Sequence, residues 1–159
     1  MTIKVGDKVP SVNVTVWTAD GPKPVSTDDL FKGKKVVLFA VPGAFTPTCS
    51  AKHLPGFVQN ADKLKAKGVD SVICMAVNDA FVMGAWGRDQ NTGEIVMMGD
   101  GSAAFTKALG LELDLSARGM GVRSQRFAFV AEDGTVTHLA VEAPGDFSVS
   151  SAEAVIASL

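Results

Sequence analysis

A chain of 159 residues is long enough to fold around one sizeable core and short for two, so we expect one domain over residues 1–159. Its 47% hydrophobic and 20% charged residues and its net charge of −2 are typical of a soluble globular protein, and they argue against nucleic acid or an anionic membrane as a partner. No apolar stretch reaches the roughly 18 residues of a membrane-spanning helix, and the first residues lack a signal-peptide core, so we expect a cytoplasmic protein.

The first 34 residues predict a small antiparallel extension ahead of the main core. Valine alternates with other residues over 12–16, which is the pattern of a half-buried strand, and Asp20-Gly21 marks the turn that follows. A polar, capped start at Ser26 then predicts a short helix that ends near Gly33.

The centre of the chain predicts a strand, a helix and a second strand. The run at 35–41 is apolar, β-branched and one strand long, and the run at 71–77 has the same character. Between them, apolar residues at helical spacing extend from Cys49 to Gly68. We expect Pro55 to bend this helix, because proline removes one N–H and crowds the carbonyl four residues before it. The order indicates a parallel βαβ unit with a right-handed crossover.

The second half of the chain predicts more helices and strands, ending in a hairpin and a helix. Asp133-Gly134 is a hairpin turn signal, whereas residues 110–125 have too little periodicity to predict more than a glycine-containing loop. The expected elements, in chain order, are a helix capped by Asn78-Asp79 that carries Phe81, Val82 and Trp86, a strand at 94–98, a turn at 99–102, a helix at 103–109, hairpin strands at 127–130 and 136–141, and a helix at 150–159.

This order of elements indicates an α/β fold. A βαβ half followed by a ββα half, with a cysteine directly after the first core strand, is the thioredoxin-like arrangement. The N-terminal β extension and an inserted helix would be additions to it. Such a fold does not by itself settle the chemistry, because one fold carries many functions.

Cys49 stands where the first core strand passes through a turn rich in Gly and Pro into a helix. Unpaired N–H groups and the positive end of the helix dipole stabilise an anion at that place, and therefore a thiolate. The helix end contributes at most about 2 kcal/mol, so a reactive thiolate needs a second donor. Thr46 is one candidate, and an arginine from elsewhere is the other. The alternative for Cys49 is a small apolar filler at a strand–helix corner.

The chain has two cysteines, Cys49 and Cys74, with no pattern of disulfide staples or zinc ligands. A dithiol oxidoreductase needs a second thiol three positions from the first, where this chain has Thr46, so general disulfide exchange is disfavoured. Peroxide reduction fits one thiolate and a hydroxyl: the sulfur attacks one oxygen, fixed donors stabilise the leaving oxygen, and a sulfenic acid forms. Cys74 lies within an apolar strand, where we expect a buried filler.

Several motifs together resemble one enzyme family. The spacing Pro42-x-x-x-Thr46-x-x-Cys49 resembles the active-site signature of the peroxiredoxins. The string Pro-Gly-Ala-Phe-Thr-Pro-Thr-Cys-Ser at 42–50, with His-Leu-Pro-Gly-Phe at 53–57, resembles the type II (type 5) subgroup, in particular its plant-like and bacterial members. The segment 77–82 and the hairpin start at 126–128 continue the resemblance, which covers nearly the whole chain.

The resemblance implies a set of catalytic residues. Cys49 is the expected peroxidatic thiolate, Thr46 is expected to hydrogen-bond it and orient the peroxide, and Pro42 is expected to shield the sulfur. The guanidinium of the family corresponds to Arg126, which would stabilise the thiolate and hold the peroxide oxygens. Arg123, three residues earlier, is the rival for this role. The alternatives are that Pro42 is an ordinary turn proline and that Arg126 is a surface arginine.

The implied substrate-binding residues are Gly43, Thr48 and His53. Backbone N–H groups around Thr48 are expected to complete the site for the negatively charged oxygen, and some family members carry glycine at this position. His53 lies one helical turn beyond Cys49 and is expected to edge the pocket; an exposed histidine without a role is the alternative. We assign no function to His138.

The resemblance implies a thiol-dependent peroxidase that reduces hydrogen peroxide and small organic hydroperoxides without a metal, haem, flavin or other cofactor. The segment 145–151 has serines where some type II relatives have a resolving cysteine, which leaves Cys74 as the one internal candidate. An external thiol is therefore expected to recycle the enzyme, either glutathione with glutaredoxin or thioredoxin. A homodimer is also implied, with a contact near Phe81 and Trp86. The alternatives are a redox-sensing or holdase module with incidental peroxide reactivity, and a thiol–disulfide oxidoreductase.

Overall fold

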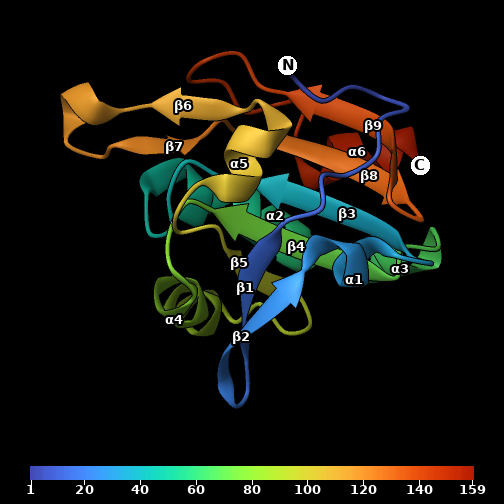
Figure 1. Ribbon diagram of the computed structural model, residues 1–159. Helices are drawn as coiled ribbons and strands as arrows, with labels where there is room; N and C mark the ends of the chain where they lie inside the picture. Colours follow the sequence, from blue (N-terminus) through green and yellow to red (C-terminus); the bar gives the residue numbers. More distant parts are fainter.

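A seven-stranded mixed β-sheet forms the centre of the computed structural model, which describes residues 1–159 (Figure 1). Its strands are β1 (Asn13–Thr18), β2 (Gly21–Ser26), β3 (Lys35–Ala40), β4 (Ser71–Ala76), β5 (Val96–Gly99), β8 (Phe127–Glu132) and β9 (Thr135–Val141). They lie in the order β2-β1-β5-β4-β3-β8-β9. Strand β4 is parallel to both β3 and β5, which confirms the βαβ unit, and the other pairs are antiparallel.

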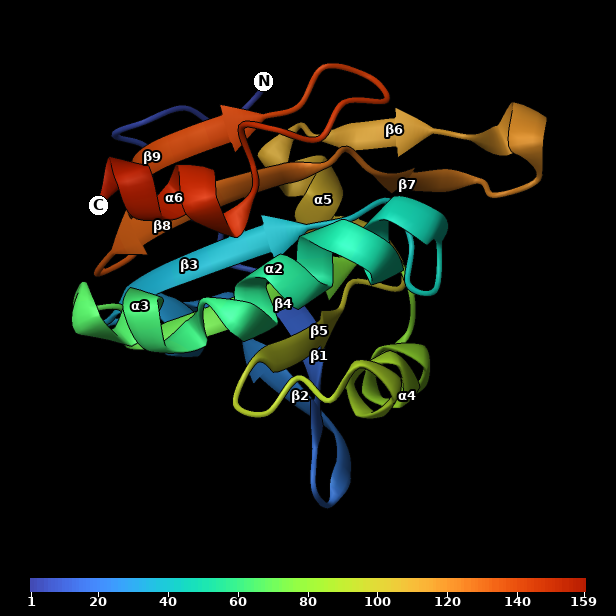
Figure 2. The same ribbon diagram turned by 180° about the vertical axis from the view of Figure 1, so that it is seen from behind.

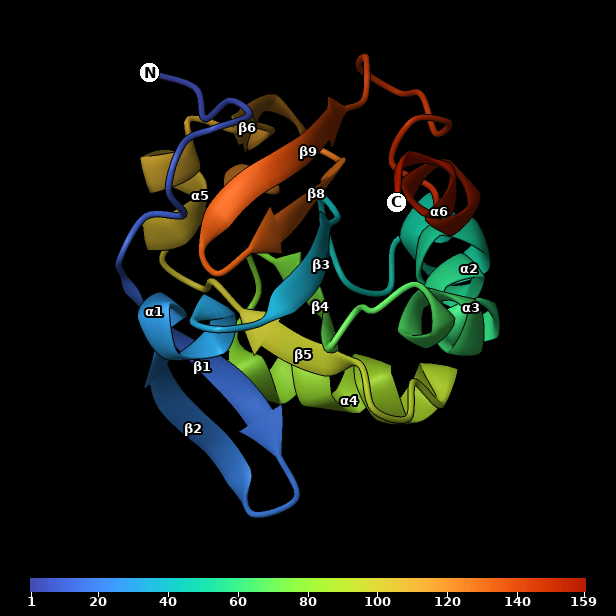
Figure 3. The same ribbon diagram turned by 90° about the vertical axis from the view of Figure 1, so that its right-hand side faces the viewer.

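Helices cover both faces of the sheet. They are α1 (Thr27–Phe31), a π-helical turn (Cys49–His53), α2 (Leu54–Gln59), α3 (Ala61–Ala66), α4 (Ala80–Gln90), α5 (Ala104–Leu109) and α6 (Ala152–Ser158). Figure 2 shows α2, α3 and α6 in front of one face, and the side view in Figure 3 shows α1 and α5 on the other. None of these helices has the length and apolar character needed to cross a membrane.

The alternation of side chains along the central strands divides the core into two parts. Phe39 of β3 packs in the part that includes residues of α2, α3, α4 and α6, whereas its neighbour Leu38 packs in the part that includes residues of α1 and α5. Both side chains are completely buried, as expected for a central strand covered on two faces. Cys49 and Cys74 belong to the same part of the core as Phe39.

The helix between β3 and β4 differs from the single bent helix that the sequence predicts. It begins with the π-helical turn, which ends just before Pro55, a residue that offers no N–H to the Ala51 carbonyl and crowds it. The wider turn accommodates that missing bond. A second interruption lies at Asn60, whose side-chain Nδ2 donates to the Gly56 carbonyl at 2.7 Å and so competes with the helical backbone.

The segment 110–125 is not the plain loop that the sequence predicts. It forms a protruding hairpin of β6 (Glu112–Asp114) and β7 (Val122–Ser124), with a 3₁₀ turn at Ser116–Arg118 between them (Figure 1). Strands of three residues are too short to show a period of two, which explains the wrong prediction. The other predicted elements agree with the structure to within two residues at each end.

Candidate active site

The loop that joins β3 to the π-helical turn is fixed by side chains from two other segments. The Ala44 N–H donates to Oδ1 of Asn78, which lies shortly after β4, at 3.0 Å. The indole N–H of Trp86 in α4 donates to the Ser50 hydroxyl, also at 3.0 Å. Cys49 therefore begins the helix at a firmly held corner, and its side chain is completely buried.

Two polar side chains contact the Cys49 sulfur. The hydroxyl of Thr46 lies 2.9 Å from Sγ, and Nη2 of Arg126 lies 3.0 Å from it. Arg126 directly precedes β8, and because β8 pairs with β3, a residue 77 positions along the chain reaches this corner. A hydroxyl and a guanidinium can both donate to sulfur, and the guanidinium places a positive charge next to it.

A chain of hydrogen bonds continues from Arg126 away from the sulfur. Arg126 Nη1 lies 2.8 Å from Nδ1 of His53, and His53 Nε2 lies 2.9 Å from the carbonyl oxygen of Ser150. Ser150 donates its backbone N–H and its hydroxyl to Oε2 of Glu142, at 2.8 and 2.6 Å. Burial, followed by the positive charge of Arg126, lowers the pKa of His53 to about 3, so the ring is neutral at neutral pH.

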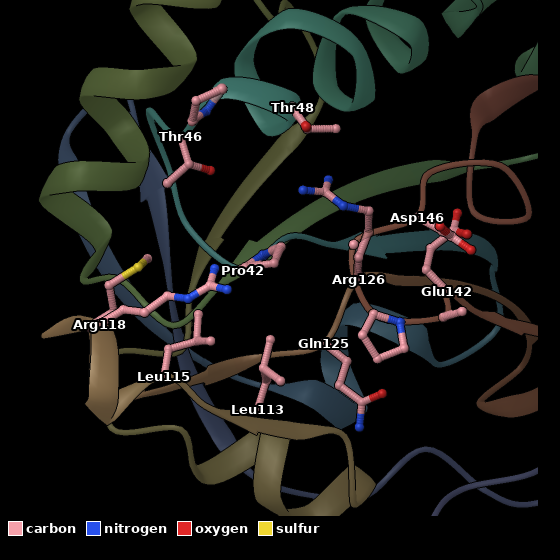
Figure 4. Close-up of a pocket in the computed structure, with 15 residues that line it drawn as sticks. Pro42, Thr46, Thr48, Leu113, Leu115, Arg118, Gln125, Arg126, Glu142 and Asp146 are labelled. Atoms are coloured by element: carbon pink, nitrogen blue, oxygen red, sulfur yellow. The ribbon is translucent and has the colours of Figure 1, made fainter.

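A cleft of about 370 Å³ opens beside these residues (Figure 4). Its walls come from the loop that holds Pro42, Thr46 and Thr48, from the β6–β7 hairpin, and from the segment after β9. The Arg126 guanidinium points toward Thr48 in Figure 4. The other lining residues are Pro47, Leu113, Leu115, Arg118, Met120, Gln125, Glu142, Ala143, Pro144, Gly145 and Asp146. The cleft therefore offers cationic and polar groups within a partly apolar wall, as small-molecule sites do.

Cys74 has different surroundings. It lies in the middle of β4, between Phe39 of β3 and Met97 of β5, and it is completely buried. Both cysteines are free. Burial, and to a smaller extent the nearby Cys49, raises the pKa of the Cys74 thiol well above its ordinary value, so this thiol stays protonated. The predicted burial of Cys74 is confirmed, and a buried, protonated thiol is a poor nucleophile.

Comparison with known proteins identifies the family. Residues 4–156 match the family model described as Redoxin. The chain is 50% identical to peroxiredoxin-2B of Arabidopsis thaliana, over 99% of this chain and 98% of the relative. The structure of reduced Prx3 from Vibrio vulnificus in complex with H₂O₂ matches with a TM-score of 0.95 and 54% identity over 99% of both chains. The chain belongs to the peroxiredoxins.

Membership in this family confirms the fold and the enzyme class that the sequence predicts. The peroxiredoxin has a thioredoxin-like α/β fold and is a thiol-dependent peroxidase, with a peroxide as substrate and a thiol as reductant. The type II (type 5) subgroup also fits, since peroxiredoxin 5 of Alvinella pompejana matches with a TM-score of 0.86 and 37% identity over 98% of this chain and 97% of that one.

The structure distinguishes the two candidate arginines of this peroxiredoxin. Arg126 contacts the sulfur, whereas Arg123 donates through Nε to the Met120 carbonyl at 2.9 Å and through Nη1 to the Pro42 carbonyl at 3.5 Å. Arg123 therefore ties the hairpin side of the cleft to the loop after β3. It makes no hydrogen bond to the thiol.

The predicted substrate-binding residues occupy three different places. Thr48 is exposed and lines the cleft. Gly43 is buried, its carbonyl accepts from the Thr46 hydroxyl at 2.7 Å, and a Cβ at this position would approach Thr46 Cγ2 to 3.1 Å. His53 does not line the cleft but lies behind Arg126, and because it is completely buried, the alternative of an exposed histidine is wrong.

The sequence did not reveal four residues that organise this site. Asn78 follows a parallel strand, and its place at the carboxyl edge of the sheet is a signal that points to function. Glu142 and Ser150 meet only because the segment after β9 folds back, which no periodicity predicts. The ring of Phe147, in the same segment, lies 5.0 Å from the histidine ring and 6.0 Å from Cζ of the sulfur-binding arginine.

Proposed function

We propose that Cys49 is the nucleophile of this peroxidase. Its thiolate attacks the terminal oxygen of a hydroperoxide, so that an S–O bond forms while the O–O bond breaks. The sulfur is oxidised to a sulfenic acid, and the leaving oxygen takes up a proton to become an alcohol, or water when the substrate is hydrogen peroxide. The contacts of Thr46 and Arg126 with Sγ, at 2.9 and 3.0 Å, are the observation that carries this proposal.

Arg126 supplies positive charge along the path that the negative charge follows. The charge begins on the sulfur and ends on the leaving oxygen. The guanidinium has five N–H donors, of which one group faces His53 and another faces the sulfur. The remaining donors can hold the peroxide oxygens, and fixed donors in a site that excludes water stabilise a transition state strongly.

Thr46 acts as a donor and an acceptor in turn. Its hydroxyl has one proton and two partners within reach, the Gly43 carbonyl at 2.7 Å and the Cys49 sulfur at 2.9 Å. When the proton points to the sulfur, it stabilises the thiolate. When the proton points to the carbonyl, the oxygen lone pairs are free to accept the O–H of an incoming hydroperoxide and orient it.

The cleft supports hydrogen peroxide and small organic hydroperoxides as substrates. Pro42 and Thr48 narrow the approach, and the Cys49 sulfur behind them has no exposed surface, which favours small molecules. Leu113 and Leu115 of the hairpin offer an apolar wall to the organic part of a larger hydroperoxide. Backbone N–H groups near Thr48 add donors for the negatively charged oxygen.

An external thiol is the reductant that we propose for the Cys49 sulfenic acid. The first thiol forms a mixed disulfide and releases water, and a second thiol frees Cys49 and leaves as the oxidised disulfide. Cys74 is a poor resolving residue because its thiol is buried and protonated. Glutathione with glutaredoxin, or thioredoxin, supplies such thiols.

Steady-state peroxide consumption tests the proposed function. We expect many turnovers with glutathione and glutaredoxin or with thioredoxin, and mass spectrometry after oxidation with glutathione is expected to find the adduct on Cys49. A single stoichiometric oxidation without turnover would instead favour a redox sensor or holdase. A Cys49–Cys74 disulfide in the oxidised chain would contradict the external reductant.

We also propose that the enzyme is a homodimer that uses the surface around Phe81. This side chain is 64% exposed, and its ring centroid lies 6.0 Å from that of Trp17. Cζ of Arg88 lies over the same Trp17 ring, 5.3 Å from its centroid. Phe45, in the loop after β3, is 53% exposed, and its ring centroid lies 6.4 Å from that of Trp86, which belongs to α4 as Phe81 does. Sedimentation of the wild-type chain and of Phe81→Asp tests this proposal: a dimer that the substitution dissociates supports it, and a monomeric wild type contradicts it.

The cytoplasmic location stays a prediction, which fractionation of cells would check.

A further inference from the structure

We infer that His53 is a positioning residue: its neutral ring, held in one tautomer by the segment after β9, aims the Arg126 guanidinium at the Cys49 sulfur. The inference deepens the proposed function and rests on Cys49 as the nucleophile. His53 itself touches neither the sulfur nor the cleft, so it acts through Arg126.

The two hydrogen bonds of the His53 ring demand the same tautomer. A guanidinium only donates, so Nδ1, at 2.8 Å from Arg126 Nη1, must be unprotonated and accept. A backbone carbonyl only accepts, so Nε2, at 2.9 Å from the Ser150 oxygen, must carry the proton. The other tautomer would bring two donors together at one end and two acceptors at the other. The imidazolium would also place an N–H against the guanidinium.

Glu142 fixes the carbonyl that selects this tautomer. Its Oε2 accepts the backbone N–H of Ser148 and both the backbone N–H and the hydroxyl of Ser150, all within 2.8 Å. Ser150 is completely buried and Glu142, at the edge of the cleft, is 7% exposed, so the bonds between these two residues face little water. The Ser150 carbonyl is therefore a fixed acceptor, and Glu142 and Arg126 are the two charged groups that act on the histidine.

Aromatic rings leave the His53 ring little freedom to turn. Phe39 lies 5.0 Å from it, Phe57 lies 5.7 Å from it, and Phe147 covers it at 5.0 Å. Both nitrogens are thus held in place by packing as well as by hydrogen bonds. With Nη1 of Arg126 bonded to the ring, Nη2 is the nitrogen that reaches the sulfur.

Two substitutions test the two ring nitrogens separately, because each amide imitates one of them. In His53→Asn, the side-chain oxygen stands where Nδ1 stood and can still accept from Arg126. In His53→Gln, the terminal amide reaches the place of Nε2 and can donate to Ser150, but nothing accepts from Arg126. We expect oxidation of Cys49 by hydrogen peroxide to slow about tenfold to a hundredfold in His53→Gln, and by less than about fivefold in His53→Asn. His138→Asn, at the other histidine of the chain, is the control and is expected to react as the wild type does.

Long-range ¹H–¹⁵N NMR of the wild-type protein provides a readout that does not depend on activity. We expect His53 to show the neutral ring with the proton on Nε2 at neutral pH. A proton on Nδ1, an imidazolium, or equal rates for the Asn and Gln variants would overturn the inference. Peroxide reduction by Cys49→Ser would instead overturn the proposed function, so the two failures are distinguishable.

Discussion

The first turn after β3 and the middle of β4 each hold one completely buried cysteine, on the same face of the same sheet. Cys49 has a hydroxyl and a guanidinium within 3.0 Å of its sulfur, whereas Cys74 is packed between the strands β3 and β5 and has no hydrogen bond from a side chain. Burial is thus the same for both, and the donors differ. Because the donors are what distinguishes the two sulfurs, we propose that they decide which of the two reacts.

Exchanging each sulfur for oxygen gives the largest expected difference between the two regions. We predict that Cys49→Ser abolishes peroxide turnover, because serine is not a nucleophile toward the O–O bond under these conditions, and that Cys74→Ser keeps most of it. A coupled assay with glutathione and glutaredoxin, or with thioredoxin, measures both. If Cys74→Ser were as inactive as Cys49→Ser while remaining folded, Cys74 would take part in the cycle.

Removing the cation from the reactive region is the next largest change. We predict that Arg126→Gln slows the oxidation of Cys49 about a hundredfold or more, because the charge that stabilises both the thiolate and the leaving oxygen is lost. Arg123→Gln is the matched control, since Arg123 contacts the carbonyls of Pro42 and Met120 and not the sulfur. Stopped-flow measurements with hydrogen peroxide give the two rates. Equal rates for both variants would remove the assigned role from Arg126.

The histidine beside Arg126 makes the stability of the reactive region depend on pH. Its pKa is about 3 in the folded chain and 6.5 without the fold, so the unfolded state binds the proton more readily and stability falls as pH decreases below 6.5. From pH 7 to pH 5 this amounts to about 2 kcal/mol. Urea unfolding at both pH values measures it. The loss is expected to be smaller by that amount in His53→Asn, and identical pH dependences for the two proteins would contradict the assignment.

The last difference between the two regions concerns the free energy of unfolding, where substitution of Cys74 is expected to cost more than substitution of Cys49. In Cys49→Ser the new hydroxyl finds Thr46 and Arg126 as partners, whereas in Cys74→Ser it is buried among apolar neighbours. We predict that Cys74→Ser lowers the free energy of unfolding by about 1–3 kcal/mol and that Cys49→Ser lowers it by less. Denaturant midpoints compare them, and a larger loss in Cys49→Ser would show that its surroundings are no more polar than those of Cys74.

The local part of the active site could be predicted from the sequence. The apolar runs of β3 and β4 and the Gly- and Pro-containing turn place Cys49 at a helix start, and Thr46 is close to it in the chain. Arg126 is different, because it comes from 77 residues away and only the family resemblance singled it out. The βαβ unit and the late hairpin were predictable because their periodic runs are long.

The rest of the site depends on contacts that no local pattern encodes. His53 was expected at the pocket edge, yet the fold places it behind Arg126, 73 residues away in the chain. Glu142 and Ser150 meet through an irregular segment, and the β6–β7 hairpin that forms one wall of the cleft has strands of only three residues. Asn78 was within reach of a prediction, because the carboxyl edge of parallel strands is where functional side chains collect.

Brief exposure to less than one equivalent of hydrogen peroxide, followed by trapping of sulfenic acid and peptide mass spectrometry, tests most directly that the donors around the sulfur decide reactivity. We predict that the trapped adduct is found on Cys49 and that Cys74 is unmodified in the folded protein. Modification of both cysteines to a similar extent, or of Cys74 first, would contradict this account.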